Sequence, residues 1–302
     1  MRRTLLALVS AALLAISLVA PATAITGDYV EDFEHPFVGL IAFYSDARGT
    51  DEAFLHRCSG SLVDDGTPAD GSRVFVTAGH CTDDGTGDDV AVSARIWFRQ
   101  DAGARFDGVN RDPLSGYPDR CIEDRDANTL DACVTSHEMY NYGFDNFAGF
   151  PDHRDAGVVI LDKPLVLPEY ATITDVGAIT GNKSVELTVS GYGISDGHAA
   201  SDPAESFRVR LMATTTLVTT NDTWTDGYNL KTQPHGSGRG GTCSGDSGGP
   251  VFFPSSSNVI VAVTSFGRTS PNDCQGNDYS YRLDRQEVID WIDEVAGNHW
   301  NQ

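Results

Sequence analysis

Basic residues are scarce in this sequence. Lys and Arg number 21 against 43 Asp and Glu, which gives a formal net charge of −22 over 302 residues. Nucleic-acid binding requires Lys and Arg to neutralise phosphates, so this balance argues against nucleic acid as a partner. An acidic surface can attract cationic molecules from a distance, although a solvated surface without any partner explains the charge more simply.

Metal-binding cysteine pairs are also absent from the sequence. No two of the six cysteines have the C-x-x-C spacing, and we therefore expect no structural zinc site. The acidic segment from Asp83 to Asp89 carries oxygen ligands of the kind that bind Ca²⁺, but its spacing does not match an EF-hand. We expect an exposed acidic loop and no cofactor, with a Ca²⁺ site as the alternative.

Long apolar runs are missing except at the amino terminus. Two arginines precede an apolar run from Leu5 to Ala20, and small residues follow up to Ala24. This pattern predicts a signal peptide over residues 1–24, and the run is too short to favour a membrane anchor. We expect a secreted, extracellular protein without membrane contact after cleavage. Its formal net charge is then −24, because the removed segment holds two arginines and no acidic residue.

Helical periodicity is missing along most of the chain. Short β-rich apolar runs are separated by clusters of Gly, Pro, Asp and Asn, which predicts antiparallel sandwiches or barrels. These runs lie at 37–43, 74–77, 91–98, 157–161, 185–189, 207–220 and 259–265. Residues 64–71 and about 101–150 have no such pattern, and we expect them to form inserted, irregular loops.

The carboxyl terminus departs from this pattern. Four apolar residues with i, i+3, i+4, i+7 spacing predict one buried helix face: Val288, Trp291, Ile292 and Val295. Asp284 with Glu287 predicts a capping box, and Gly297 predicts the end of the helix. We therefore expect a closing helix over about residues 285–296.

Six cysteines in an exported chain predict three disulfides, for which fifteen pairings exist in principle. Cys121 and Cys133 are close in sequence and lie in the same loop-like region. We expect these two to be bonded to each other.

The segment from Gly241 to Pro250 carries the strongest functional signal. Its sequence Gly-Thr-Cys-Ser-Gly-Asp-Ser-Gly-Gly-Pro surrounds Ser247 with glycines. Glycines open the hydroxyl to a substrate and let consecutive backbone N–H groups point at one oxyanion. Ser247 is therefore a candidate nucleophile.

A serine nucleophile needs a neutral base, and that base needs a carboxylate that fixes its tautomer. His80 ends the sequence Val74-Phe-Val-Thr-Ala-Gly-His, beside a cysteine that can anchor it. Asp155 leads directly into the apolar run Ala-Gly-Val-Val-Ile-Leu. Taken singly, such a histidine and such an aspartate are more often ordinary structural or surface residues. Their candidacy rests on their match with Ser247.

These segments, in the order His, Asp, Ser, resemble the trypsin/chymotrypsin family of serine endopeptidases over nearly all of the mature chain. Cys58-Ser-Gly-Ser-Leu62, Gly191-Tyr-Gly193 and Thr264-Ser-Phe-Gly267 resemble further motifs of that family. The resemblance implies an all-β, chymotrypsin-like fold of two antiparallel six-stranded β-barrels with a C-terminal α-helix. The protease domain would span residues 25–302, with barrel one at about 38–166 and barrel two at about 170–283.

The resemblance also implies a role for each matching residue. Ser247 would attack the scissile carbonyl, His80 would move the proton and Asp155 would hold His80. The N–H groups of Gly245 and Ser247 would form the oxyanion hole. Ser265 would support Asp155. The remaining implied features are substrate binding by Ser265 and Gly267 and the disulfides Cys58–Cys81 and Cys243–Cys274.

An activation pair is implied as well. Ile25-Thr-Gly27 resembles the amino-terminal Ile-Val-Gly-Gly of the family, whose new amino terminus pairs with the acid before the serine, here Asp246. Ile25 directly follows the predicted signal cleavage site. We therefore expect signal peptidase alone to create the active terminus, without a separate pro-peptide.

In the trypsin/chymotrypsin family, the residue six positions before the nucleophile lies at the base of the primary specificity pocket, and in this sequence that residue is Gly241. Aspartate at this position would predict a strict preference for Arg or Lys, so strict trypsin-like specificity is not expected. Gly241 and Gly267 leave an open pocket for large apolar side chains. Asp278 would add acceptance of basic side chains if it faces inward, and an exposed turn position is its alternative.

Two other functions remain as alternatives. Gly245-Asp-Ser-Gly-Gly249 also matches the Gly-x-Ser-x-Gly elbow of α/β-hydrolase esterases, but only His299 follows it and alternating helices are missing. A non-catalytic homologue that acts as a binding protein is the other. The favoured interpretation is a monomeric protease with protein or peptide substrates and with proteinaceous inhibitors as candidate partners.

Overall fold

The computed structural model describes the chain from Ile25 to Gly297 with several gaps. The described residues are 25–45, 53–64, 66, 70–83, 90–105, 116–117, 133–180, 183–195, 205–234, 236–268, 274 and 276–297. The predicted signal peptide, Cys121 and residues 84–89 of the acidic segment lie outside them. Within these ranges, the helices are all too short or too polar to cross a membrane.

Barrel one is a seven-stranded sheet with the order β7-β6-β3-β4-β5-β9-β8. Its strands are β3 (Val38–Ser45), β4 (Ala53–Leu62), β5 (Ser72–Thr77), β6 (Ser93–Trp97), β7 (Cys133–Ser136), β8 (Glu138–Asn141) and β9 (Gly157–Leu165). Strands β7 and β8 follow each other directly, on either side of His137. The Ser136 hydroxyl donates to the Ile160 carbonyl at 2.6 Å, so β7 also approaches β9 and the sheet nearly closes.

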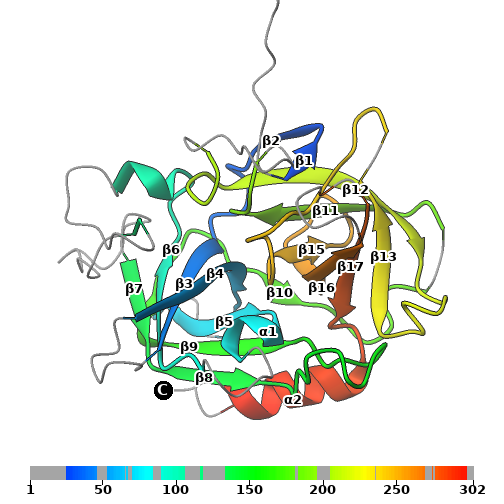
Figure 1. Ribbon diagram of the computed structural model, residues 1–302. Helices are drawn as coiled ribbons and strands as arrows, with labels where there is room; N and C mark the ends of the chain where they lie inside the picture. Colours follow the sequence, from blue (N-terminus) through cyan, green and yellow to red (C-terminus); the bar gives the residue numbers. More distant parts are fainter. Residues whose placement is uncertain are drawn as a thin grey trace, which may run out of the picture.

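Barrel two is closed by six antiparallel strands, in the cyclic order β11-β12-β13-β17-β16-β15. They are β11 (Glu186–Gly191), β12 (Leu211–Thr219), β13 (Asn229–Gln233), β15 (Pro250–Phe252), β16 (Val259–Arg268) and β17 (Asn277–Arg282). Two short strands extend this sheet: β2 (Tyr29–Glu31) pairs with β12, and β10 (Thr172–Ile173) pairs with β16. The two barrels lie side by side (Figure 1).

Four further elements are short. Strand β1 (Thr26–Gly27) pairs with β14 (Gly240–Gly241), α1 (Gly79–Thr82) follows β5, and η1 (Ala102–Arg105) follows β6. The predicted all-β fold of two barrels with a closing helix is confirmed.

The closing helix is α2 (Gln286–Ala296), and its predicted apolar face is the buried one. Val288 and Ile292 join the main hydrophobic core, in which barrel one supplies most residues, and the Trp291 ring lies 5.0 Å from the Tyr142 ring. Figure 1 shows α2 beside β8 and β9, at the foot of the molecule. Gly297 caps the helix as expected.

The predicted capping box of α2 is wrong. The N-cap residue is Arg285, which makes no side-chain capping bond. Asp284 accepts a hydrogen bond from the Ile179 backbone N–H at 2.9 Å instead and pairs with Arg282 at 2.7 Å. The Asp284 carboxylate therefore bonds to Ile179 and Arg282, and not to the first turn of the helix as its sequence predicted.

The predicted insertion over residues 101–150 is shorter than expected. Residues 133–141 form β7 and β8, which pair with β6 and β9 inside barrel one. This part of the segment therefore belongs to the barrel and not to an inserted loop.

Candidate active site

The centre of the site is a pair formed by buried Asp155 and partly exposed His80. Asp155 is fully buried just before β9, and the His80 side chain on α1 is 25% exposed. The His80 backbone N–H donates to Asp155 Oδ1 at 2.8 Å, and His80 Nδ1 lies 2.9 Å from Asp155 Oδ2. Because a carboxylate only accepts, Nδ1 carries the proton and Nε2 is the basic nitrogen.

The electrostatics of this pair favour the charged forms. Burial alone would lower the pKa of His80, but the charge and hydrogen bond of Asp155 outweigh burial and raise it. Burial would likewise raise the pKa of Asp155, yet the charge and hydrogen bond of His80 hold it below its usual value. Asp155 therefore stabilises an imidazolium at His80 and stays ionised beside it.

The turn around Ser247 packs against the segment that leads into His80. The Ser59 N–H donates to the Ser247 carbonyl at 2.8 Å. Gly248 has φ of +77°, and a Cβ added there would lie 2.0 Å from Thr77 Oγ1 and 2.6 Å from the Ala78 nitrogen. Only glycine permits both this conformation and this close approach. The Gly-rich turn thus brings Ser247 next to the end of β5, from which α1 carries His80.

Two backbone donors beside Ser247 are free to bind a ligand. Within the described ranges, the N–H groups of Gly245 and Ser247 and the Ser247 hydroxyl have no hydrogen-bond partner. Gly245 has φ of +96°, a conformation that side chains rarely adopt. The arrangement offers two N–H groups and a hydroxyl to an incoming carbonyl.

Asp246 points away from this turn into the protein and is fully buried. Its Oδ1 accepts from the Gly193 N–H at 2.7 Å and its Oδ2 from the Cys243 N–H at 2.9 Å. Burial outweighs these bonds and raises the pKa of Asp246 to about 7. Ile25 is also fully buried, and the next residue, Thr26, pairs with Gly241 in the same region.

Asp278 faces inward, which decides between its two predicted positions. It is only 4% exposed, and its Oδ2 accepts from the Thr242 N–H at 2.7 Å. A Cβ added to Gly241 would lie 2.5 Å from Asp278 Oδ2, and one added to Gly267 would lie 4.0 Å from Oδ1. The carboxylate therefore lies between Gly241 and Gly267, and burial raises its pKa to about 7.

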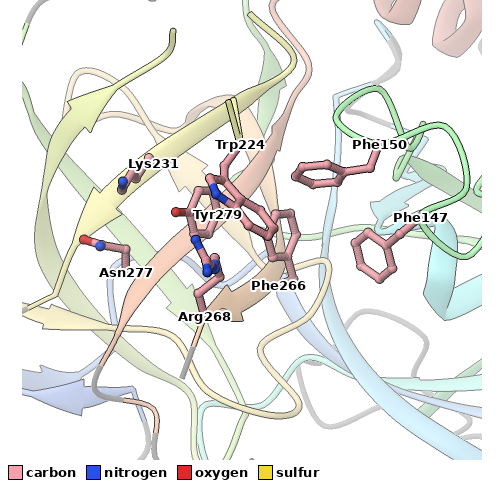
Figure 2. Close-up of a pocket in the computed structure, with 9 residues that line it drawn as sticks. Phe147, Phe150, Trp224, Lys231, Phe266, Arg268, Asn277 and Tyr279 are labelled. Carbon is pink, nitrogen blue, oxygen red and sulfur yellow. The ribbon is translucent and has the colours of Figure 1, made fainter. Parts of the chain in front are cut away.

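An aromatic pocket of about 890 Å³ adjoins the Phe266–Gly267 segment of β16 (Figure 2). Phe266 stacks on Tyr279 at 4.7 Å between ring centroids, and the Arg268 guanidinium lies 3.7 Å from the Trp224 ring centroid. The remaining lining residues are Phe147, Phe150, Lys231, Gly267 and Asn277. Apolar walls with cations at the rim suit a flat or apolar group.

Comparison with known families decides the relationship, because the trypsin family profile matches residues 25–292. The chain belongs to the trypsin family. A search of curated proteins finds no match.

Solved structures share the trypsin-family fold at low identity. An HL collagenase has a TM-score of 0.57 at 17% identity, covering 90% of this chain and 98% of its own. The protease Anisep from Arthrobacter nicotinovorans has a TM-score of 0.58 at 17% identity, covering 89% and 100%. A scabies mite inactivated protease paralogue has a TM-score of 0.53 at 16% identity, covering 87% and 95%. These likenesses establish the chymotrypsin-like fold and no more.

Both disulfides implied by the trypsin-family resemblance are present, Cys58–Cys81 and Cys243–Cys274. The first bonds the residue that follows His80 to strand β4. The second joins the Ser247 turn to Cys274, which precedes strand β17. Cys121 lies outside the described residues, so its bond to Cys133 stays a prediction.

One residue of this trypsin-family site was missed by the sequence reasoning. His153 is fully buried two residues before Asp155, and its Nε2 lies 2.9 Å from Ser265 Oγ. The sequence offered only its nearness to Asp155, because Ser265 is 112 residues further along the chain.

Proposed function

We propose that the chain is an exported serine endopeptidase that acts as a monomer on protein or peptide substrates. The observation that carries the proposal is the pairing of buried Asp155 with His80 Nδ1, which leaves Nε2 as the basic nitrogen. The Ser247 turn packs against Thr77 and Ala78, the residues that lead into the helix of His80. Membership of the trypsin family supports the same reaction.

In the proposed reaction, Ser247 Oγ attacks the carbonyl carbon of the scissile peptide bond while His80 Nε2 takes the hydroxyl proton. The N–H groups of Gly245 and Ser247 bind the oxyanion, an interaction typically worth ~10²–10³ in rate per donor. The C–N bond then breaks as His80 returns the proton to the leaving amine. Water, activated by His80, hydrolyses the acyl-enzyme and releases Ser247.

Activation in this proposal requires only signal cleavage after Ala24. Cleavage would give Ile25 a free α-amino group for the proposed pairing with Asp246. Asp246 accepts two backbone N–H bonds and, within the described residues, has no cationic side chain beside it. An ammonium group would stabilise the buried carboxylate. Amino-terminal sequencing of the secreted protein tests this step, and a terminus well away from Ile25 would contradict it.

We further propose that the primary pocket accepts large apolar and basic side chains. The open space lies on the Gly267 side, where a Cβ would meet only Asp278 Oδ1 at 4.0 Å, whereas a Cβ on Gly241 would lie 2.1 Å from Pro234. The buried Asp278 carboxylate between these glycines would provide a counter-charge for Lys or Arg. The aromatic pocket beside Phe266 would take an apolar or aromatic side chain further towards the amino end of the substrate, because β16 lies next to it.

A fluorophosphonate probe, which reacts with activated serines, tests the reaction. We expect labelling of the secreted protein and none of its Ser247→Ala variant. Fold alone does not decide activity, since one similar structure is described as an inactivated protease paralogue. Absence of labelling in both proteins, with the terminus at Ile25, would favour the non-catalytic binding protein.

A further inference from the structure

A second histidine, His153, lies close to Asp155. His153 Nε2 lies 2.9 Å from Ser265 Oγ and 3.9 Å from Asp155 Oδ2. The Ser265 hydroxyl is itself hydrogen-bonded to Asp155 Oδ2. At the other end, His153 Nδ1 lies 3.1 Å from the Pro151 carbonyl oxygen. A continuous chain of groups within hydrogen-bond distance therefore runs from Pro151 through His153, Ser265 and Asp155 to His80.

The His153 ring is held in place by aromatic neighbours. Phe147 and Phe150 stack on it with interplanar angles of 27° at 5.0 and 5.8 Å. Three more rings meet it edge-on: Phe144, Phe266 and Tyr281. This enclosure excludes water, so the ring nitrogens depend on their protein partners for hydrogen bonds.

Counting protons shows why His153 matters to Asp155. The Pro151 carbonyl only accepts, so it requires a proton on Nδ1. If His153 is neutral, Nε2 has a lone pair that competes with Asp155 Oδ2 for the single Ser265 proton. If Nε2 is also protonated, it donates to Ser265 Oγ, and the Ser265 proton is free for Asp155.

The charged groups around His153 affect whether its ring is neutral or protonated. Asp155 and Asp152 lie on its own segment, and His80 faces it from α1. Tyr281 on β17 donates to Asp152 Oδ1 at 2.8 Å, and Arg285 Nη1 lies 3.7 Å from the same oxygen. On β16 the contact is the neutral Ser265. Burial lowers the pKa of His153, which favours its neutral form near pH 7.

We propose that His153 is a positioning residue that directs the Ser265 hydroxyl, and thereby controls how many hydrogen bonds reach Asp155 behind His80. The inference rests on the proposed function, because it concerns the same Asp155–His80 pair. Neutral His153 competes for the Ser265 proton and weakens its hydrogen bond to Asp155, so the carboxylate is more basic and supports a protonated His80 more strongly.

The variant His153→Phe tests this direction, because phenylalanine keeps a ring in the aromatic enclosure but cannot accept from Ser265. The Ser265 proton is then committed to Asp155. We expect the acidic limb of the kcat/KM profile to move to lower pH by roughly half a pH unit. In a Ser265→Ala background the same substitution should produce no shift, because the hydroxyl through which His153 acts on Asp155 is missing.

The resonance of the His80 Nδ1 proton provides a readout that does not need catalysis. Titrating it by proton NMR in the His153→Phe and parent proteins, each also carrying Ser247→Ala, should show the same downward shift of the His80 transition. A purely structural role would lower the active-site concentration or the melting temperature and leave both profiles in place. Unchanged profiles in correctly folded His153→Phe, or an equal shift in the Ser265→Ala background, would overturn the proposal. Failure of the fluorophosphonate test would overturn the proposed function alone, since the NMR titration still reports on the histidines.

Discussion

Asp155 is buried, yet it receives hydrogen bonds from the His80 backbone, the His80 ring and the Ser265 hydroxyl. These bonds allow an ionised carboxylate to persist in a site that would otherwise favour its neutral form. Its orientation is therefore fixed from both sides, and so is the His80 tautomer.

Replacing Asp155 with Asn tests the importance of that tautomer. The Asn amide can donate to Nδ1, which would move the His80 proton to Nε2 and remove the base. We expect kcat/KM on a peptide substrate to fall about 10⁴-fold, as such a tautomer change does in related triads. The concentration of folded protein, checked by circular dichroism, should be unchanged. A loss of less than about tenfold would contradict the assigned role.

The Asp278 carboxylate predicts a pH-dependent choice of substrate. Its pKa is raised to about 7 by burial, so it is largely protonated below that pH and ionised above it. We expect the ratio of kcat/KM for a Lys substrate to that for a matched Tyr substrate to rise as pH increases through about 7. His80 titration affects both substrates equally and cancels in the ratio. In Asp278→Asn the ratio should be low and independent of pH.

At the scale of elements, strands β13, β16 and β17 and the loops that carry Phe147, Phe150 and Trp224 form the aromatic pocket of Figure 2. Trp224 forms one wall of it, stacked under Arg268. We expect Trp224→Ala to reduce kcat/KM about tenfold for peptides with an aromatic residue a few positions before the cleavage site. Peptides with Ala at those positions serve as the matched control and should be unaffected. Equal losses for both peptide sets would place the binding of that residue elsewhere.

Elements with a strong local pattern were predictable from sequence, and elements that depend on distant partners were not. The apolar face of α2 and seven barrel strands are encoded by periodicity and turn residues: β3, β5, β6, β9, β11, β12 and β16. The predicted apolar runs did not include β4, β13, β15 and β17. Strands β7 and β8 were missed because they are four residues each and mostly polar or half-buried. Their pairing with β6 and β9 supplies the order that their own sequence does not signal.

The same distinction applies to the candidate site. His80, Asp155 and Ser247 stand in sequence motifs, and the structure brings the segments that carry them together. The inward position of Asp278 depends on the register of β16 and β17, in which it pairs with Gly267, and could not be read from its turn-like sequence. His153 became visible only through its contact with Ser265.

For the molecule as a whole, two buried carboxyl groups make stability depend on pH. Asp246 and Asp278 have folded pKa values raised to about 7 from 3.8, so between these values the folded state binds more protons than the unfolded one. The stability that each group contributes is lost as pH rises through this range, at up to about 1.4 kcal/mol for every pH unit. The lowered pKa values of Asp32 and Asp155 act in the opposite direction, but below about pH 4.

Thermal unfolding of the Ser247→Ala protein, which avoids self-cleavage, measures this dependence. With a short Gly-Ser extension ahead of Ile25, we expect the melting temperature to fall between about pH 5 and pH 8. With a free Ile25 amino group paired to Asp246, the fall should be smaller, because the carboxylate then gains a counter-charge. Adding Asp278→Asn should flatten both curves. Identical curves for the extended and free forms would argue against the pairing.

The pairing of β1 with β14 has a practical consequence for producing this protein. Thr26 pairs with Gly241 and Gly27 with Gly240, and Gly241 belongs to the proposed primary pocket. An affinity tag fused ahead of Ile25 would therefore be carried to the pocket, and purification through it would select molecules that lack the free Ile25 amine. Helix α2 ends at Ala296 at the opposite end of the molecule (Figure 1). Recombinant enzyme is best tagged after that helix and released from its leader by a single cut, directly before Ile25.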